Sequence, residues 1–101
     1  MNIIRNKVEG DTVLSEDTQF FGMIVGKTTV SENTLLELHG MIIGDLILEK
    51  DSTVYLNGMV NGNVINKGGI LHVFGMVNGQ IVRQKGQTVV DSKALVRNGI
   101  H

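Results

Sequence analysis

Several residue types are missing, or almost missing, from this 101-residue sequence. It contains no cysteine, no proline and no tryptophan, and its only alanine is Ala94. The lack of cysteine excludes disulfide scaffolds, thiol catalysis and thiolate metal sites. Alanine is the best helix former, whereas β-branched residues favour strands. One alanine beside 30 valines, isoleucines and threonines therefore argues against a helical domain.

Excess charge and long apolar segments are also lacking. Nine Lys and Arg against ten Asp and Glu give a net charge of −1, without the basic excess that nucleic-acid binding needs. No segment approaches the roughly 18 apolar residues of a membrane span, and the N-terminus lacks the apolar core of a secretory signal. We expect a cytoplasmic protein with no nucleic-acid partner. A membrane contact at the extreme N-terminus stays open as an alternative.

The glycines, in contrast, are numerous and periodic. Eight of the 13 form four Gly-x-x-x-Gly phrases that begin at positions 22, 40, 58 and 75. The resulting spacings of 18, 18 and 17 residues are too short for helical-pair repeats or propeller blades, and are typical of one coil of a β-solenoid. The same phrase occurs at contacts between transmembrane helices, but here polar residues surround it and no apolar 20-residue segment is present.

Alternation within each repeat predicts which side chains point inward. Apolar residues and glycines occupy every second position, which is the periodicity of a strand. In one repeat the predicted interior positions are Leu36, Leu38, Gly40, Ile42, Gly44, Leu46 and Leu48. The glycines therefore lie on the interior face, where either a bend of the wall or a leucine crossing the lumen leaves no room for a side chain.

Polar, turn-forming segments separate the apolar stretches once per repeat. We predict an all-β, single-stranded β-solenoid of about five coils of 17–18 residues. One domain spans residues 1–101, with an N-terminal partial coil or cap at 1–21, regular coils at 22–91 and a C-terminal cap at 92–101. Apolar residues also recur every six positions from 24 to 60, as in left-handed hexapeptide helices, but the series fails at Asn66. We therefore expect a right-handed coil.

The repeated phrase, as in Leu38-His39-Gly40-Met41-Ile42-Ile43-Gly44-Asp45-Leu46, resembles the repeat of the bactofilins. The likeness extends over about residues 8–91. It implies a right-handed β-helix of the bacterial cytoskeleton that polymerises end to end without nucleotide. The sequence differs from the family in its slightly shorter core and in lacking proline-bearing flanking tails.

Candidate residues for catalysis or metal binding are few and scattered. His39 and His72 are predicted to point outward from different columns, with no carboxylate at a suitable spacing, and His101 is the last residue. An acyltransferase would need a histidine in a cleft. The aspartates form no Asp-x-Asp loop. We expect no catalytic residue, no metal, no cofactor and no small-molecule substrate, and hence no enzyme.

The outward side of the glycine-rich wall is the first candidate site. If the glycines point inward, four of the five methionines stack in one outward column. Such an apolar surface is typical of a protein contact, for which methionine is an adaptable residue. The predicted interaction face comprises Phe21, Met23, Val25, His39, Met41, Ile43, Asn57, Met59, Phe74 and Met76. Alternatively, a terminal segment covers this wall, the methionines pack locally, or Ile47, Ile65 and Val82 form the contact surface.

The two ends of the solenoid are the second candidate site. Terminal coils expose unpaired backbone groups and the end of the apolar core, and no capping helix is evident. The predicted self-association residues are Ile3, Ile4, Val8, Leu95, Val96 and Ile100. Alternatively, the termini fold over the ends as plugs. Two functions follow: a bactofilin-like scaffold whose partners are its own copies or another protein, or a small immunity or antitoxin protein that neutralises a toxin.

Overall fold

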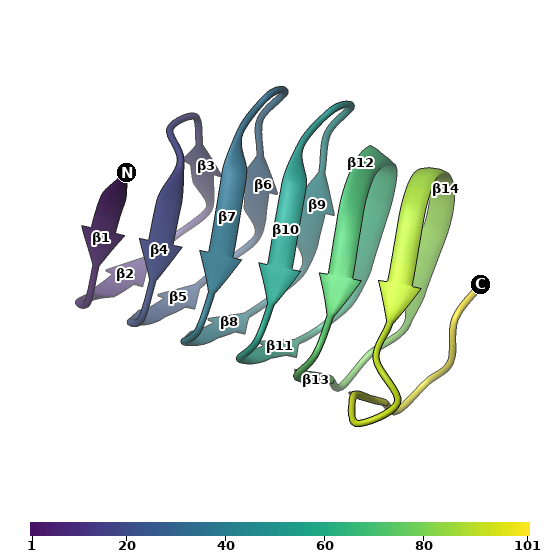
Figure 1. Ribbon diagram of the computed structural model, residues 1–101. Coiled ribbons are helices and arrows are strands. Elements are labelled where there is room, and N and C mark those ends of the chain that lie inside the picture. The colour runs from purple at the N-terminus through teal and green to yellow at the C-terminus, as the bar shows by residue number, and fades with distance from the viewer.

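The chain is wound into a three-walled β-solenoid (Figure 1), described here over residues 1–101 from a computed structural model. It has 15 strands and no helix, so it contains no helix that could cross a membrane. The first wall begins with β1 (Asn2–Ile4), β4 (Thr18–Phe20), β7 (Leu35–Leu38) and β10 (Thr53–Leu56). The third begins with β3 (Thr12–Leu14), β6 (Thr28–Val30) and β9 (Leu46–Leu48).

Two long strands turn the corner from the third wall to the first. They are β12 (Val64–Val73) and β14 (Ile81–Val90), and their pairing is irregular between Asn66 and Ile70. The second wall is a separate sheet of six short strands. These are β2 (Lys7–Glu9), β5 (Met23–Val25), β8 (Met41–Ile43), β11 (Met59–Asn61), β13 (Met76–Val77) and β15 (Leu95–Val96).

The winding is right-handed, as the sequence predicts. In Figure 1 the near strands β7 and β10 run downward, the more distant β6 and β9 run upward, and successive coils advance from the N-terminal to the C-terminal side. All pairs between coils are parallel. Their register follows the repeat: Val8 pairs with Ile24, Ile24 with Ile42, and Val60 with Val77.

The predicted interior is confirmed. Seventeen buried apolar side chains form one continuous core, and Leu36, Leu38, Ile42, Leu46 and Leu48 are all fully buried within it. The apolar residues six positions apart correspond to the three walls, each contributing once per coil. The position that breaks this series, Asn66, also points inward and is fully buried.

The paired glycines form the two corners that border the second wall. A Cβ atom on Gly40 would overlap the carbonyl oxygen of Gly22, and one on Gly58 that of Gly40. Gly44 and Gly62 are stacked in the same way at the other corner. The glycines do lie at bends of the wall, as one of the two explanations expected, but neither explanation named the obstacle: a Cβ would meet the backbone of the preceding coil, and no leucine crosses there.

The third corner is built from polar residues. Asn33 and Asp51 adopt left-handed backbone conformations, with φ of 58° and 61°. Buried hydroxyls close the same turns, because Thr34 Oγ1 donates to Glu32 O at 3.2 Å and Ser52 Oγ donates to Glu49 O at 2.7 Å. Asn and Asp tolerate this conformation better than most side chains, which explains the recurrent polar segments.

Regular winding extends beyond residues 22–91 at both ends. In the first coil β1, β2 and β3 pair with β4, β5 and β6. At the other end β15 pairs with β13, and Ile100 forms a parallel bridge with Ile81. The terminal segments thus continue the coil instead of folding across its ends.

Candidate interaction surfaces

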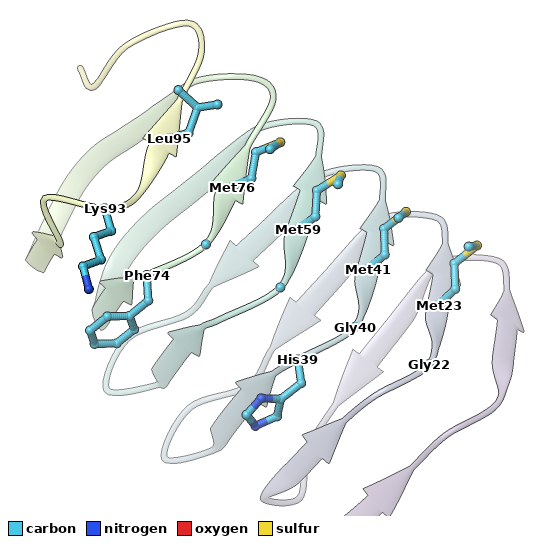
Figure 2. Close-up of a pocket in the computed structure, with 12 residues that line it drawn as sticks. Gly22, Met23, His39, Gly40, Met41, Met59, Phe74, Met76, Lys93 and Leu95 are labelled. Carbon is cyan, nitrogen blue, oxygen red and sulfur yellow. The ribbon is translucent and has the colours of Figure 1, made fainter.

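The four methionines form one column on the outside of the second wall. Met23 pairs with Met41, Met41 with Met59, and Met59 with Met76. Figure 2 shows the four side chains pointing the same way from successive coils. The register extends the column by one residue at each end, to Lys7 before Met23 and to Leu95 after Met76.

An open, mainly apolar groove of about 610 Å³ runs beside this column. Its floor is the row of corner glycines Gly22, Gly40, Gly58 and Gly75, which have no side chains to fill the space beside the methionines. His39 and Phe74 stand on the opposite side from the methionines, and Lys93 lies near one end (Figure 2). Only Lys93 and Leu95 of the C-terminal segment line the groove, so no terminal segment covers it. The methionines are half-buried by one another and by the wall.

Aromatic rings stack along the corner between the first two walls. The rings of Phe21 and His39 lie 4.7 Å apart and nearly parallel, and the Arg5 guanidinium lies 4.9 Å from the Phe21 ring. Further along, His72 stacks between Tyr55, at 5.2 Å, and Phe74, at 6.2 Å. These contacts stack partly exposed rings on one another. Two of the rings, His39 and Phe74, form the aromatic border of the groove.

The remaining residues of the predicted face divide into two groups. Val25 and Ile43 pair on the far side of the methionines, in a column that Asn61 continues. Asn57 and Phe74 follow His39 along the aromatic corner, and each donates its backbone N–H to a leucine of the preceding coil. The groove itself includes His39, Phe74 and the methionines, but not Phe21, Val25, Ile43 or Asn57. The Ile47, Ile65 and Val82 column lies on the third wall, away from it.

The prediction that no carboxylate accompanies the histidines is wrong for His39. Its Nε2 lies 3.6 Å from Glu37 Oε1, because residues i and i+2 of a strand project from the same side. Glu37 also accepts a hydrogen bond from Gln19 Nε2 at 3.4 Å. Both members of the pair are partly exposed on a convex corner. No group of three or more His, Asp or Glu side chains comes together anywhere.

The dispersed aspartates have a structural role. Asp11 Oδ1 accepts the backbone N–H of Lys27 at 2.9 Å, and Asp45 Oδ1 accepts that of Asn63 at 2.9 Å. Asn63 repeats the contact with the N–H of Gln80 at 3.0 Å. Each side chain follows a corner glycine and ties its coil to the next. The sequence contains this signal as an Asp or Asn directly after the second glycine of a phrase, or after its equivalent Gly10: Gly10-Asp11, Gly44-Asp45 and Gly62-Asn63.

The six predicted coil-end residues separate into core and outer positions. Ile4, Val8, Val96 and Ile100 are in register with the buried residues Phe20, Ile24, Val77 and Ile81. Ile4, Val8 and Val96 pack against the core and extend it toward the two ends, whereas Ile100 is 38% exposed and only continues the column of Ile81. Ile3 and Leu95 point outward instead, with exposed fractions of 56% and 44%, because alternation places them one residue out of phase. Leu95 belongs to the methionine column.

Sequence reasoning missed several residues at these surfaces. Lys7 and Lys93 were not assigned to the interaction face, although register places Lys7 in the methionine column and Lys93 lies beside the groove. Val90 and Ala94, which pack against the core at the C-terminal end, were also missed. Extending the 17-residue period beyond the last glycine phrase would have found Val90, 17 positions after Val73.

Comparison of the chain with protein-family models, curated proteins and solved structures gave no match. The geometry of the two surfaces therefore carries the functional argument, and the likeness to bactofilins is that of the repeated phrase alone.

Proposed function

We propose that this protein is a non-catalytic, bactofilin-like cytoplasmic scaffold that acts by protein–protein contact. Its copies associate through the coil ends, and the groove beside the methionine column docks a partner protein. The scattered histidines and aspartates favour a structural chain over an enzyme, since the aspartates are used in coil-to-coil hydrogen bonds.

The observation that carries this proposal is the state of the two ends. At the N-terminal end β1, β2 and β3 each have a neighbour on one side only, and so does β15 at the other end. The core residues Ile4, Val8, Val90 and Val96 are only partly buried there. Exposed strand edges with apolar side chains are templates for pairing with another chain. Stacking a second copy on such an end would complete both the sheets and the core.

The test is the size of the purified protein over a wide concentration range. Light scattering should show mass increasing with concentration, and electron microscopy should show rods of the solenoid's width. A strict monomer, or a closed dimer that grows no further, would contradict self-association through the ends.

The groove is tested separately with Met41→Lys and Met59→Lys. These methionines lie on central coils, away from both ends. We expect the variants to fold and assemble as the wild type does and to lose only the partner protein. Loss of folding would contradict the docking role.

A second candidate function, neutralisation of a toxin by direct binding, is favoured by the groove itself. The surface is built on a continuous sheet with stacked rings at its border, a preformed arrangement in which binding would require little ordering. This function predicts a monomer that forms a stable complex with one cognate protein. A neighbouring toxin gene would support it, and assembly of the protein alone into rods would favour the scaffold.

A further inference from the structure

The two ends of the solenoid carry matching residues in matching columns. Parallel register makes each column traceable through all coils: Asn2 pairs with Thr18, Thr18 with Leu36, and Val54 with Leu71, which in turn pairs with Thr88. If the first coil of a second copy is placed on the C-terminal end, the β1 strand of that copy therefore aligns with the second half of β14. This alignment sets Ile3 of the second copy beside Val89 and its Ile4 beside Val90.

We propose that copies of this chain join head to tail, with the C-terminal end of one placed on the N-terminal end of the next so that both sheets continue in parallel register. The inference rests on the proposed self-association and adds its polarity and its register. The partner at each end is a second copy of the same chain.

The backbone groups at the two ends are complementary. In a parallel ladder, alternate residues bond to a given neighbour. Asn2 N–H donates to Asp17 O at 2.8 Å, and Ile4 O accepts from Phe21 N–H at 2.8 Å, so the groups of Ile3 face the open end. At the other end Asp91 N–H donates to Val73 O at 2.9 Å, which leaves the groups of Val90 facing outward along the axis. Stacking a second copy repeats the pattern of every internal coil.

The core continues across the same junction. Val90 would lie over Ile4 of the next copy and Val96 over its Val8, since these residues occupy the inward columns of the first and second walls. Each of the four is partly buried in the single copy. Aliphatic side chains therefore meet aliphatic side chains in both columns.

Charge complementarity supports this polarity. The column of Glu9 runs through Val25, Ile43 and Asn61 to Arg97, whose Nε donates to Asn78 Oδ1 at 2.9 Å. Head-to-tail stacking thus places Arg97 beside Glu9 of the next copy. A second charged pair lies in the column of the aromatic corner. Each member of this column directly follows the last inward residue of the first wall: Arg5 follows Ile4 in the first coil, and Asp91 follows Val90 in the last. Head-to-tail stacking therefore also places Asp91 beside Arg5 of the next copy.

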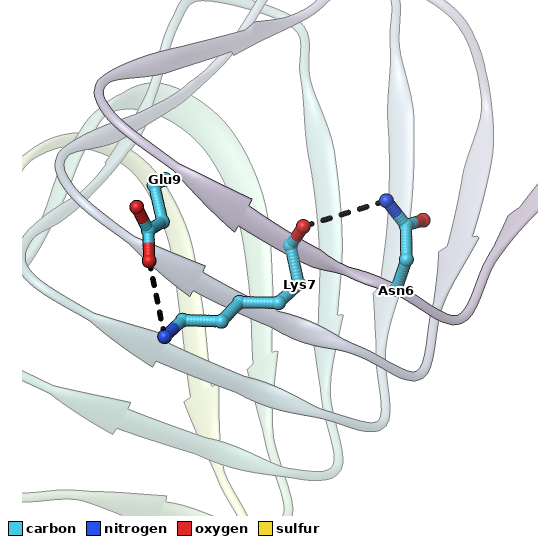
Figure 3. A network of polar contacts seen from close by, with 3 residues as sticks. All are labelled: Asn6, Lys7 and Glu9. Carbon is cyan, nitrogen blue, oxygen red and sulfur yellow. Dashed lines mark hydrogen bonds and ion pairs between the residues drawn. The ribbon is translucent and has the colours of Figure 1, made fainter.

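The existing partners of these charges do not prevent the exchange. Glu9 Oε1 lies 3.1 Å from Lys7 Nζ (Figure 3), and the side chains of Glu9 and Lys7 are 74% and 58% exposed. Such a pair contributes little by itself because solvent screens it. Lys7 would lie beside Leu95, where its aliphatic stem can cover the leucine.

Disulfide trapping tests the register directly, because the chain has no cysteine of its own. Ile3→Cys and Val89→Cys alter outward side chains that are 56% and 42% exposed, so neither removes a core contact. Neighbouring strands lie about 4.8 Å apart, within the range of Cα separations that a disulfide spans. Nitrogen-15-labelled Ile3→Cys protein is mixed with unlabelled Val89→Cys protein and oxidised, and the dimers are identified by mass.

The proposal expects mixed-mass dimers to predominate. Val13→Cys is the matched control: it is also exposed and in the first coil, but on the third wall, and should not cross-link with Val89→Cys. Predominant dimers of Ile3→Cys with itself, or of Val89→Cys with itself, would overturn the polarity and leave self-association standing. No disulfide in any mixture would overturn both.

A charge exchange provides a second measurement. Glu9→Arg should shift half-assembly to at least about tenfold higher protein concentration, and adding Arg97→Glu in the same chain should restore it. Lys67→Glu, an exposed change on β12 at the corner between the third and first walls, one coil away from the C-terminal edge, should leave assembly unchanged. Equal effects of Glu9→Arg with and without Arg97→Glu would contradict the proposed pair.

Discussion

The glycine corners and the polar corner turn the same chain by different physical means. At the glycine corners the coils lie so close that no Cβ fits between successive backbones. At the polar corner, side chains enter the turn and satisfy its backbone groups, as Ser52 and Asn66 do. Close approach of backbones dominates at the glycine corners, whereas side-chain hydrogen bonds close the polar corner, although Gly69 and Gly86 there also lie against the preceding coil. The two types of corner should therefore respond differently to substitution.

The largest effect is expected at a glycine corner. Gly58→Ala would place a methyl group against the carbonyl oxygen of Gly40, which belongs to the backbone and cannot rotate away. We expect a loss of about 3 kcal/mol or more in the free energy of unfolding, measured by urea denaturation. Gly10→Ala is the control, since nothing lies within 4 Å of its Cβ and only the φ of 107° is unfavourable. If both variants lose the same stability, backbone conformation and not close approach explains the glycine phrases.

The next largest effect is expected at the polar corner. Asn66 is fully buried: its Oδ1 accepts the N–H groups of Gly68 and Gly69, and its Nδ2 donates to Gly69 O and Gln87 O. Asn66→Leu would restore the apolar series but leave these backbone groups without partners. We expect a loss of about 2 kcal/mol, measured by thermal and urea unfolding. An unchanged stability would mean that the corner does not depend on this side chain.

A third pair of variants should change stability in opposite directions. Thr28 follows a glycine corner, and its buried Oγ1 has no hydrogen-bond partner, whereas Thr34 Oγ1 in the polar corner donates to Glu32 O. Thr28→Val should therefore raise the free energy of unfolding by about 1 kcal/mol, and Thr34→Val should lower it by about 1 kcal/mol. Calorimetry of the two near-isosteric variants makes the comparison. A decrease for both would contradict the contrast between the corners.

The smallest effect is expected at Asp51, where the polar corner has a φ of 61°. Glycine enters this region without the steric cost that a Cβ brings, so Asp51→Gly should stabilise the fold by about 0.5 kcal/mol. Asp51→Ala should instead destabilise it by about 1 kcal/mol. The shift of the urea midpoint measures both, and a destabilising glycine would indicate a role for the carboxylate.

Much of the fold was predictable because a solenoid repeats its solution in every coil. Alternation around Leu36 and Leu38 predicted the core, and the period of the glycine phrases predicted that Met23, Met41, Met59 and Met76 would be stacked. Sequence reasoning was less successful where the pattern is interrupted. Asn66 looked like the end of the six-residue series, yet it lies inside because its amide closes a turn that an aliphatic residue could not close.

The ends of the chain were the hardest part to predict. Ile3 and Leu95 were grouped with Ile4, Val8 and Val96 as apolar residues of the coil ends, but they are out of phase with the inward positions and face solvent. Short strands of three residues give too few positions to establish phase without a neighbour. Pairing with the next coil settles it, because the neighbour's register fixes which residues point inward.

By itself the sequence determined the all-β solenoid, its period, its interior and its column of methionines, because a periodic sequence in parallel register must stack like on like. The tertiary structure decided the rest. It placed the glycines against the backbone of the preceding coil, and it set Glu9 and Arg97 at opposite ends of one column. These relations join residues one or more coils apart. Whether they form depends on the close packing of one coil on the next.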